Sequence, residues 1–277
     1  MSTRTDEGLP PGRETGRRPA PDPGRPAPAQ APAAAPTAAL TPAQARLRGQ
    51  LAIGARSLSL GGHDDFNQGQ VSARLPGSRS FQIKGALTGF DECRPEDVVP
   101  ADVDPDAPAH RLAPPELALH QAVYEARPDV NAVVHSHAPH TLVFGATDLA
   151  VRPVSHDGAY FEDRLPRFTL TSNTILDIAT GRAVADALGS APALLLRNHG
   201  GLVVGKSLKH AVVLAHLLER ACRLQLMAEA VPGGYHSSPA TDVEAKREFI
   251  YGDLAVRSYW EHSVRSVLRT WPEAVAW

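Results

Sequence analysis

Cysteine is nearly absent from this chain, and its scarcity excludes a disulfide-stapled or cysteine-ligated protein. Cys93 and Cys222 are the only cysteines among 277 residues, and they are far apart in the sequence. Two widely separated cysteines form neither a disulfide framework nor a cysteine metal motif. Free thiols are typical of a reducing compartment, so we expect a cytoplasmic protein.

Aromatic residues, excess charge and long apolar runs are scarce as well. The aromatic content is 5% and the formal net charge is -2. A chain with so few rings and so little net charge has no electrostatic or stacking basis for binding nucleic acid. No apolar run approaches the roughly 20 residues that cross a bilayer. We therefore expect neither a nucleic-acid nor a membrane partner.

What the chain does contain is a polar tail followed by a globular domain. Residues 1–40 are rich in proline, alanine, glycine and arginine, a composition that cannot bury a core and predicts disorder. Residues 41–277 have the length and the hydrophobic content for a single domain.

Local patterns within 41–277 predict alternating strands and helices. Thr41-Pro42-Ala43-Gln44 has the N-cap, the first-turn proline and the capping-box glutamine of a helix start. Further helices are expected over 116–124, 175–188, 208–230 and about 240–268. Strands are expected over 71–75, 81–84, 130–137, 167–171, 193–197 and 202–205, with a connector over 100–113 and a loop around 156–162. Hairpins and few parallel crossovers indicate an α/β fold with a mainly antiparallel sheet covered by helices.

The central candidate for a site is a His-x-His pair at the end of a predicted buried strand. Val133 and Val134 lead directly into His135-Ser136-His137. Residues two apart on a strand point to the same face, so both imidazoles are expected to approach one point. Two nitrogen donors on a rigid strand end are typical of a transition-metal site.

Two further residues supply the donors that such a pair needs. His199 follows a fully apolar strand and is flanked by glycines, and Glu116 lies at a predicted helix start. Three imidazoles and one carboxylate suit zinc, iron or manganese with positions left for a substrate.

The order and spacing of these residues resemble the class II aldolase/adducin superfamily. The resemblance rests on Glu116 with Leu119-His120, on Arg127-Pro128-Asp129, on His135-x-His137 and on Arg197-Asn198-His199-Gly200. It implies α/β/α layers around a central, mainly antiparallel sheet, and a homotetramer with active sites at subunit interfaces. It also implies that His135, His137 and His199 hold the metal and that Glu116 is a metal-side carboxylate and general acid/base. Tyr160 falls about where aldolases of the family carry a proton-donating tyrosine.

The chain departs from the family's aldolases where they hold a substrate phosphate. The positions that carry amide and hydroxyl donors in those enzymes read Gly69-Gln70, Gly85-Ala86 and Pro114-Pro115 here. A phosphate would lose several charge-assisted hydrogen bonds, each worth roughly 1.5–3 kcal/mol. A sugar phosphate is therefore disfavoured, and Gln70, Arg74 and Lys84 are the candidates for binding a carboxylate or a phenol instead.

A branch of this fold that is not aldolytic is the best match for the chain as a whole. The sequence is similar to the non-haem iron oxygenases of aminocoumarin antibiotic biosynthesis, including at Phe66-Asn67-Gln68-Gly69-Gln70. That similarity implies Fe(II), dioxygen and an aromatic 2-oxo acid, 3-dimethylallyl-4-hydroxyphenylpyruvate, which is oxidatively decarboxylated to the mandelate and then the benzoate. The alternatives are a Zn(II) or Mn(II) lyase, either an aldolase or a decarboxylase, acting on a non-phosphorylated carboxylate, and a metal-free scaffold of the adducin kind. Retention of all three histidines and Glu116 argues against the scaffold.

Overall fold

The computed structural model describes residues 40–277, which form one compact unit. We predicted disorder for residues 1–40, and all of these except residue 40 lie outside the described part of the chain. Among the described residues, no helix combines the length and the apolar character that a membrane span requires.

One mixed sheet runs through the centre of the described unit. Its strands are β1 (Gln70–Arg74), β2 (Ser80–Lys84), β3 (Val98–Asp102), β4 (Ala132–Ser136), β5 (Arg167–Phe168), β6 (Ala193–Leu196) and β7 (Gly200–Gly205). They lie in the order β3-β2-β1-β4-β7-β6-β5. Every neighbouring pair is antiparallel except β5 and β6, which are parallel. The predicted α/β fold with a mainly antiparallel sheet is confirmed.

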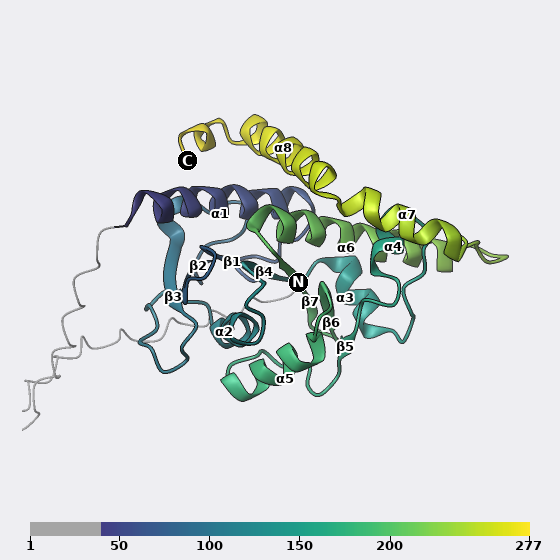
Figure 1. Ribbon diagram of the computed structural model, residues 1–277, viewed down its shortest axis with the longest axis horizontal. Coiled ribbons are helices and arrows are strands. Elements are labelled where there is room, and N and C mark those ends of the chain that lie inside the picture. The colour runs from purple at the N-terminus through teal and green to yellow at the C-terminus, as the bar shows by residue number, and fades with distance from the viewer. Residues whose placement is uncertain (1–39) are drawn as a thin grey trace, which may run out of the picture. The chain divides into compact units, whose positions relative to one another are not determined.

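Helices cover both faces of this sheet (Figure 1). One layer holds α1 (Pro42–Leu60) and α6 (Leu208–Glu229), with α8 (Asp253–Thr270) packed against both of them. The opposite layer holds α2 (Leu117–Ala126) and α5 (Ile178–Leu188), which contact each other closely. The remaining helices are α3 (Pro139–Ala146), α4 (His156–Phe161) and α7 (Ala240–Tyr251), and α4 packs on both α6 and α7.

The two layers enclose separate hydrophobic cores because successive strand residues point to opposite faces. In β4, Ala132 and Val134 join the core under α1 and α6, whereas Val133 joins the core under α2 and α5. His135 continues the Val133 side of the strand and is fully buried. The strand's alternation therefore directs this imidazole toward the start of α2.

Local signals placed several elements correctly. Thr41 caps α1 as predicted, with the Gln44 amide N–H bonded to the Thr41 hydroxyl oxygen at 3.2 Å. The predicted hairpin is the antiparallel pair β1 and β2.

Other local predictions were wrong or only partly confirmed. The predicted connector over 100–113 overlaps β3, an edge strand in which Pro100 pairs with Gln82; a proline is compatible with a sheet edge, where its missing N–H is not needed. The predicted loop around 156–162 contains the short helix α4, capped by Ser155, whose hydroxyl accepts the Gly158 N–H. The predicted strand 167–171 is limited to β5, and the last helical region is divided at Gly252 into α7 and α8.

Candidate metal centre

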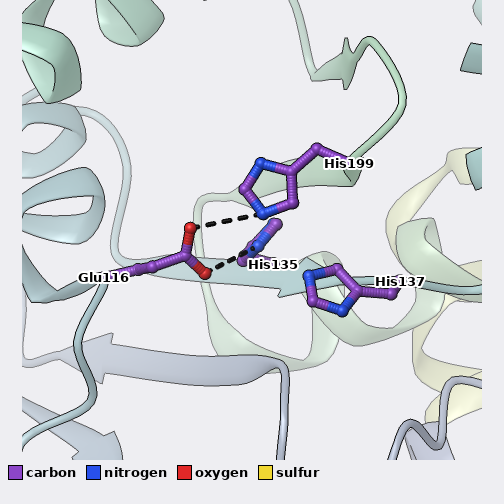
Figure 2. Close-up of side chains that lie close together, drawn as sticks. All are labelled: Glu116, His135, His137 and His199. Carbon is purple, nitrogen blue, oxygen red and sulfur yellow. Dashed lines mark ion pairs between the residues drawn. The ribbon is translucent and has the colours of Figure 1, made fainter. Parts of the chain in front are cut away.

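Four side chains from distant parts of the sequence converge at one end of the sheet. His135 comes from β4, His137 follows it, His199 lies between β6 and β7, and Glu116 immediately precedes α2. One possible ligand atom from each of the four lies within 4.8 Å of those of the other three. Figure 2 shows the Glu116 carboxylate pointing at His135 and His199, with His137 beside them. The convergence predicted for these four residues is present.

Two of the imidazoles are oriented through their other ring nitrogen. Nδ1 of His135 donates to the Gly201 carbonyl oxygen at 3.0 Å, and Nδ1 of His137 donates to the Asp65 carboxylate at 2.8 Å. When the rings are neutral, these bonds leave Nε2 of both without a proton and available as a donor to a cation. Both Nε2 atoms are buried, and apart from the Glu116 carboxylate 3.1 Å from His135 Nε2 they have no polar partner among the described protein atoms. This arrangement of aligned nitrogens fits a transition-metal ion.

Glu116 is held by four groups. Its Oε2 lies 3.1 Å from His135 Nε2 and its Oε1 lies 3.3 Å from His199 Nε2. The Ile175 backbone N–H donates to Oε1 at 3.0 Å, and the Gln70 side-chain amide donates to Oε2 at 3.4 Å. Glu116 was expected inside the first helical turn, but it is the residue before the helix and its side chain does not cap it. The carboxylate is turned to the histidines instead.

The electrostatics of the cluster follow from this pairing. Burial by itself raises the pKa of Glu116, but the charge of His135 and the hydrogen bonds from His135, His199 and the Ile175 N–H outweigh it and lower that pKa strongly. Burial by itself lowers the pKa of His135, but the Glu116 charge outweighs it and raises that pKa. The lowered pKa of Glu116 keeps its carboxylate ionised, which is the form that binds a cation. The raised pKa of His135 favours a proton on this ring when no cation is bound, and a cation bound to His135 Nε2 would replace that proton.

The backbone around His199 is built for close approach. Asn198 adopts a left-handed conformation with φ of 56°. A Cβ atom on Gly200 would lie 2.5 Å from the Ser136 carbonyl oxygen and 2.9 Å from the His137 ring. Only glycine therefore permits the start of β7 to pack against the end of β4, which brings His199 to the other two imidazoles.

The three predicted substrate-binding residues lie in different environments. Gln70 pairs directly with His135 across β1 and β4 and is buried beside Glu116. Lys84 is buried near the same end of the sheet, and its ammonium donates to the carbonyl oxygens of residues 67, 85 and 88. Burial lowers the pKa of Lys84 to about 8.

Arg74 lies at the other end of β1 from Gln70, about 13 Å away at the usual strand rise. Its guanidinium donates to the carbonyl oxygens of Tyr124, Arg127 and Val130 and stacks over the Tyr124 ring at 4.6 Å. These contacts tie β1 to the end of α2. We do not include Arg74 among the substrate-binding residues of the proposed site, because its N–H groups already donate to backbone carbonyl oxygens far from the cluster.

The structure does not bring Tyr160 to the cluster. Tyr160 lies on α4, packs against Tyr251 with ring centroids 4.7 Å apart, and lines a cavity beside Gly205 and Lys206. That cavity is at the opposite end of β7 from His199. Burial raises the pKa of Tyr160 to about 12. We therefore do not assign Tyr160 the role of proton donor to the cluster of its own chain.

Sequence reasoning missed the partners that orient the ligands. Asp65 lies in a loop with other polar residues, and nothing in its local pattern distinguishes it from its neighbours. The Ile175 N–H and the Gly201 carbonyl are backbone groups, which carry no side-chain signal at all. Metal-binding histidines commonly donate their second ring N–H to a carboxylate, so considering the acidic residues as partners of each candidate histidine could have pointed to Asp65.

Comparison with known proteins places this fold and site in a family. Residues 50–226 match the Class II Aldolase and Adducin N-terminal domain, and the chain belongs to that family. The crystal structure of an aldolase II superfamily protein from Pseudomonas syringae has a TM-score of 0.74 and 26% identity, over 84% of this chain and 96% of that one.

Two relatives have named activities. The chain is 27% identical to the 3,4-dihydroxyphthalate decarboxylase of Arthrobacter keyseri, over 82% of this chain and 96% of that protein. It is 31% identical to the 4-hydroxy-3-prenylphenylpyruvate oxygenase/4-hydroxy-3-prenylbenzoate synthase of Streptomyces roseochromogenus subsp. oscitans, over 54% of this chain and 55% of that protein. Together with the cluster, these relationships support a metal-dependent, class II aldolase-like enzyme.

Proposed function

We propose that this chain is a metal-dependent enzyme that removes carbon dioxide from a small, non-phosphorylated aromatic carboxylate. The observation that carries the proposal is the convergence of three imidazoles on the buried Glu116 carboxylate, with His137 Nε2 buried and without a partner among the described protein atoms. His135 and His137 would hold the metal through Nε2, together with His199 and Glu116. A divalent metal there would supply Lewis-acid polarisation of a substrate oxygen, and iron would add the redox chemistry that dioxygen needs.

Glu116 is positioned to act as the general acid/base of this reaction. Loss of carbon dioxide from a carboxylate leaves an electron pair on carbon, and a proton must be delivered to that carbon to complete the reaction. Glu116 is ionised, so it would first take a proton from water or from a substrate hydroxyl and then pass it to that carbon; such a proton transfer typically contributes 10²–10⁴-fold to the rate. The bonds from Gln70 and the Ile175 N–H keep the Glu116 side chain in place while it does so.

The surroundings of the cluster support a substrate without a phosphate. Pro114 and Pro115, directly before Glu116, have no backbone N–H to offer to an anion. The nearby ammonium of Lys84 is already bonded to three carbonyl oxygens. The named decarboxylase and oxygenase relatives both act on aromatic acids, which supports an aromatic carboxylate as the substrate class.

Oxidative decarboxylation is the second candidate. The 31% identity to the prenylphenylpyruvate oxygenase favours it, although the match spans 55% of that protein. In that case the metal would be Fe(II), and the substrates would be dioxygen and a prenylated aromatic 2-oxo acid. The two candidates share the release of carbon dioxide and differ in whether oxygen is consumed.

The deciding experiment combines metal analysis with gas measurements. The protein is purified without oxygen, its metal content is determined, and it is then supplied with 3,4-dihydroxyphthalate or with 4-hydroxyphenylpyruvate with and without a prenyl group. We expect metal-dependent release of carbon dioxide that is equal with and without oxygen. Release that requires oxygen and consumes it would establish the second candidate instead. Full activity after complete removal of metal would contradict both.

We also expect a homotetramer, as the family resemblance implies. Light scattering coupled to gel filtration measures the assembly directly. A monomer that retains full activity would contradict this expectation.

A further inference from the structure

A cavity of about 220 Å³ opens beside the metal cluster. Its lining includes Asn67, Gln70, Lys84, Leu87, Pro114 and Pro115. Gln70 contacts the Glu116 carboxylate and Pro115 precedes it, so the cavity begins next to the proposed reaction site. A cavity of about 150 Å³ is large enough for benzene, so a ring-sized group fits here.

The cavity offers no free positive charge. Lys84 is the only basic residue that lines it, and its ammonium is bonded to carbonyl oxygens of residues 67, 85 and 88 and stacked on the Phe90 ring at 5.6 Å. The amide N–H of Asn67 is used by the Ala86 carbonyl oxygen. An anionic group in this cavity would lose its hydration without gaining an ion pair, which is unfavourable.

The orientation of the Gln70 amide is determined by Glu116. A carboxylate only accepts hydrogen bonds, so the Gln70 amide nitrogen must face Glu116 Oε2, 3.4 Å away. The other end of the amide, Oε1, is then a buried acceptor, and it has no partner among the described protein atoms. Gln70 as a whole is 3% exposed. An acceptor buried this deeply beside a cavity calls for a donor from whatever fills that cavity.

We propose that Gln70 Oε1 accepts a hydrogen bond from an uncharged hydroxyl group of the substrate and thereby selects hydroxylated over anionic groups at this position. Since the same amide contacts Glu116, the hydroxyl lies close to the end of the substrate that is held at the metal. The inference rests on the proposed function, because it assigns a specificity to the substrate of that site. It makes Gln70 a specificity-determining residue, whereas Lys84 stabilises the surrounding loops.

Metal-chelating probes test this assignment by binding alone. Full-length protein loaded with Zn²⁺ is titrated calorimetrically with benzohydroxamate and its 2-, 3- and 4-hydroxy derivatives. In a parallel series methyl groups or carboxylates replace the hydroxyls. A methyl group matches a hydroxyl in size but cannot donate. We expect at least one hydroxy isomer to bind about tenfold more tightly than its methyl and carboxylate counterparts, as expected for a satisfied buried acceptor.

Variants locate the effect. In Gln70→Met the ratio between the Kd values of the methyl and hydroxy probes should fall to about one, and this ratio does not depend on any change in zinc affinity that follows from losing the bond to Glu116. Gln225→Met removes an equally buried glutamine amide from α6, whose partners include Arg152 and Ala150, and it should keep the full preference.

Three results would contradict the assignment: methyl probes binding as tightly as every hydroxy isomer, a carboxylate probe binding as tightly as the best of them, or an unchanged preference in Gln70→Met. The first two are read from the original protein and do not depend on how the variant folds. Failure of benzohydroxamate to bind in a zinc-dependent way would instead contradict the proposed metal site.

Discussion

Two groups of buried histidines lie on opposite sides of the same strand end, and only one of them has the features of a metal site. His135, His137 and His199 converge on Glu116. On the other side, His63 and His216 contact each other edge to face, with ring centroids 5.5 Å apart. His63 Nδ1 bonds the Ser136 hydroxyl at 2.8 Å, and His216 Nε2 bonds the Ser57 hydroxyl at 3.0 Å.

The difference lies in the neighbours and not in burial. His63 Nε2 is also buried and without a partner among the described protein atoms, as is His137 Nε2. Within residues 40–277, no carboxylate forms a hydrogen bond or ion pair with His63 or His216, and burial lowers their pKa values to about 3 and about 4. His135 beside Glu116 has its pKa raised instead. A lone unpartnered imidazole nitrogen is therefore a weak indication of a metal, whereas convergence on a carboxylate is a strong one.

Removing one ligand should give the largest contrast between the two groups. His135→Ala deletes a donor nitrogen, and we expect metal affinity to fall by more than the 10–100-fold typical of outer-sphere changes. His216→Asn retains a polar partner for Ser57 and should leave metal content unchanged. Metal analysis of both purified variants checks this. Equal metal content in the two would show that the cluster does not bind the ion.

Replacing the carboxylate should separate metal binding from proton transfer. Glu116→Gln keeps the shape of the side chain but cannot move a proton, so turnover should fall by about 10²–10⁴-fold while metal is still bound. Metal content and the rate of carbon dioxide release are measured on the same sample. A variant that binds metal and turns over at the original rate would exclude Glu116 as the acid/base group.

Weakening the support of His137 should have an intermediate effect. Asp65→Asn replaces the carboxylate that accepts from His137 Nδ1 and should lower metal affinity by about 10–100-fold. Competition with a chelator measures the affinity. The matched control is Asp64→Asn in the same loop, where Asp64 bonds the Ser59 hydroxyl and contacts no histidine. Equal losses in the two variants would point to a general disturbance of the loop.

The smallest effect concerns the pH dependence of stability. Because burial lowers the pKa of His216 to about 4, the unfolded chain binds up to one more proton than the folded chain between that pH and about 6.5, the usual pKa of histidine. Stability contributed by neutral His216 is therefore complete above pH 6.5 and is lost as the pH falls, by up to about 1.4 kcal/mol per pH unit. His216→Asn should flatten this slope in urea unfolding between pH 7 and pH 5. Identical slopes would show that His216 does not titrate in this way.

The position of the His-x-His pair on a strand and the fold class could be predicted from the sequence because both have local signatures. His135 and His137 lie two apart on an apolar strand, so the pleat alone directs them to one face. The capping box at Thr41 and the apolar runs of β4 and β6 likewise act over a few residues. Signals of this kind need no knowledge of distant contacts.

The position of the ligands relative to one another was decided only by the tertiary structure. Glu116 reaches His135 because α2 packs across the face of β4, and Asp65 reaches His137 from a loop that precedes it by 72 residues. The same holds for Tyr160, which the family resemblance suggested for the site, and for Arg74, which the sequence suggested; the tertiary packing of this chain places both away from the cluster. Pairing between strands and packing of helices join residues far apart in the chain, so the contacts of a polar side chain depend on surfaces that no local pattern describes.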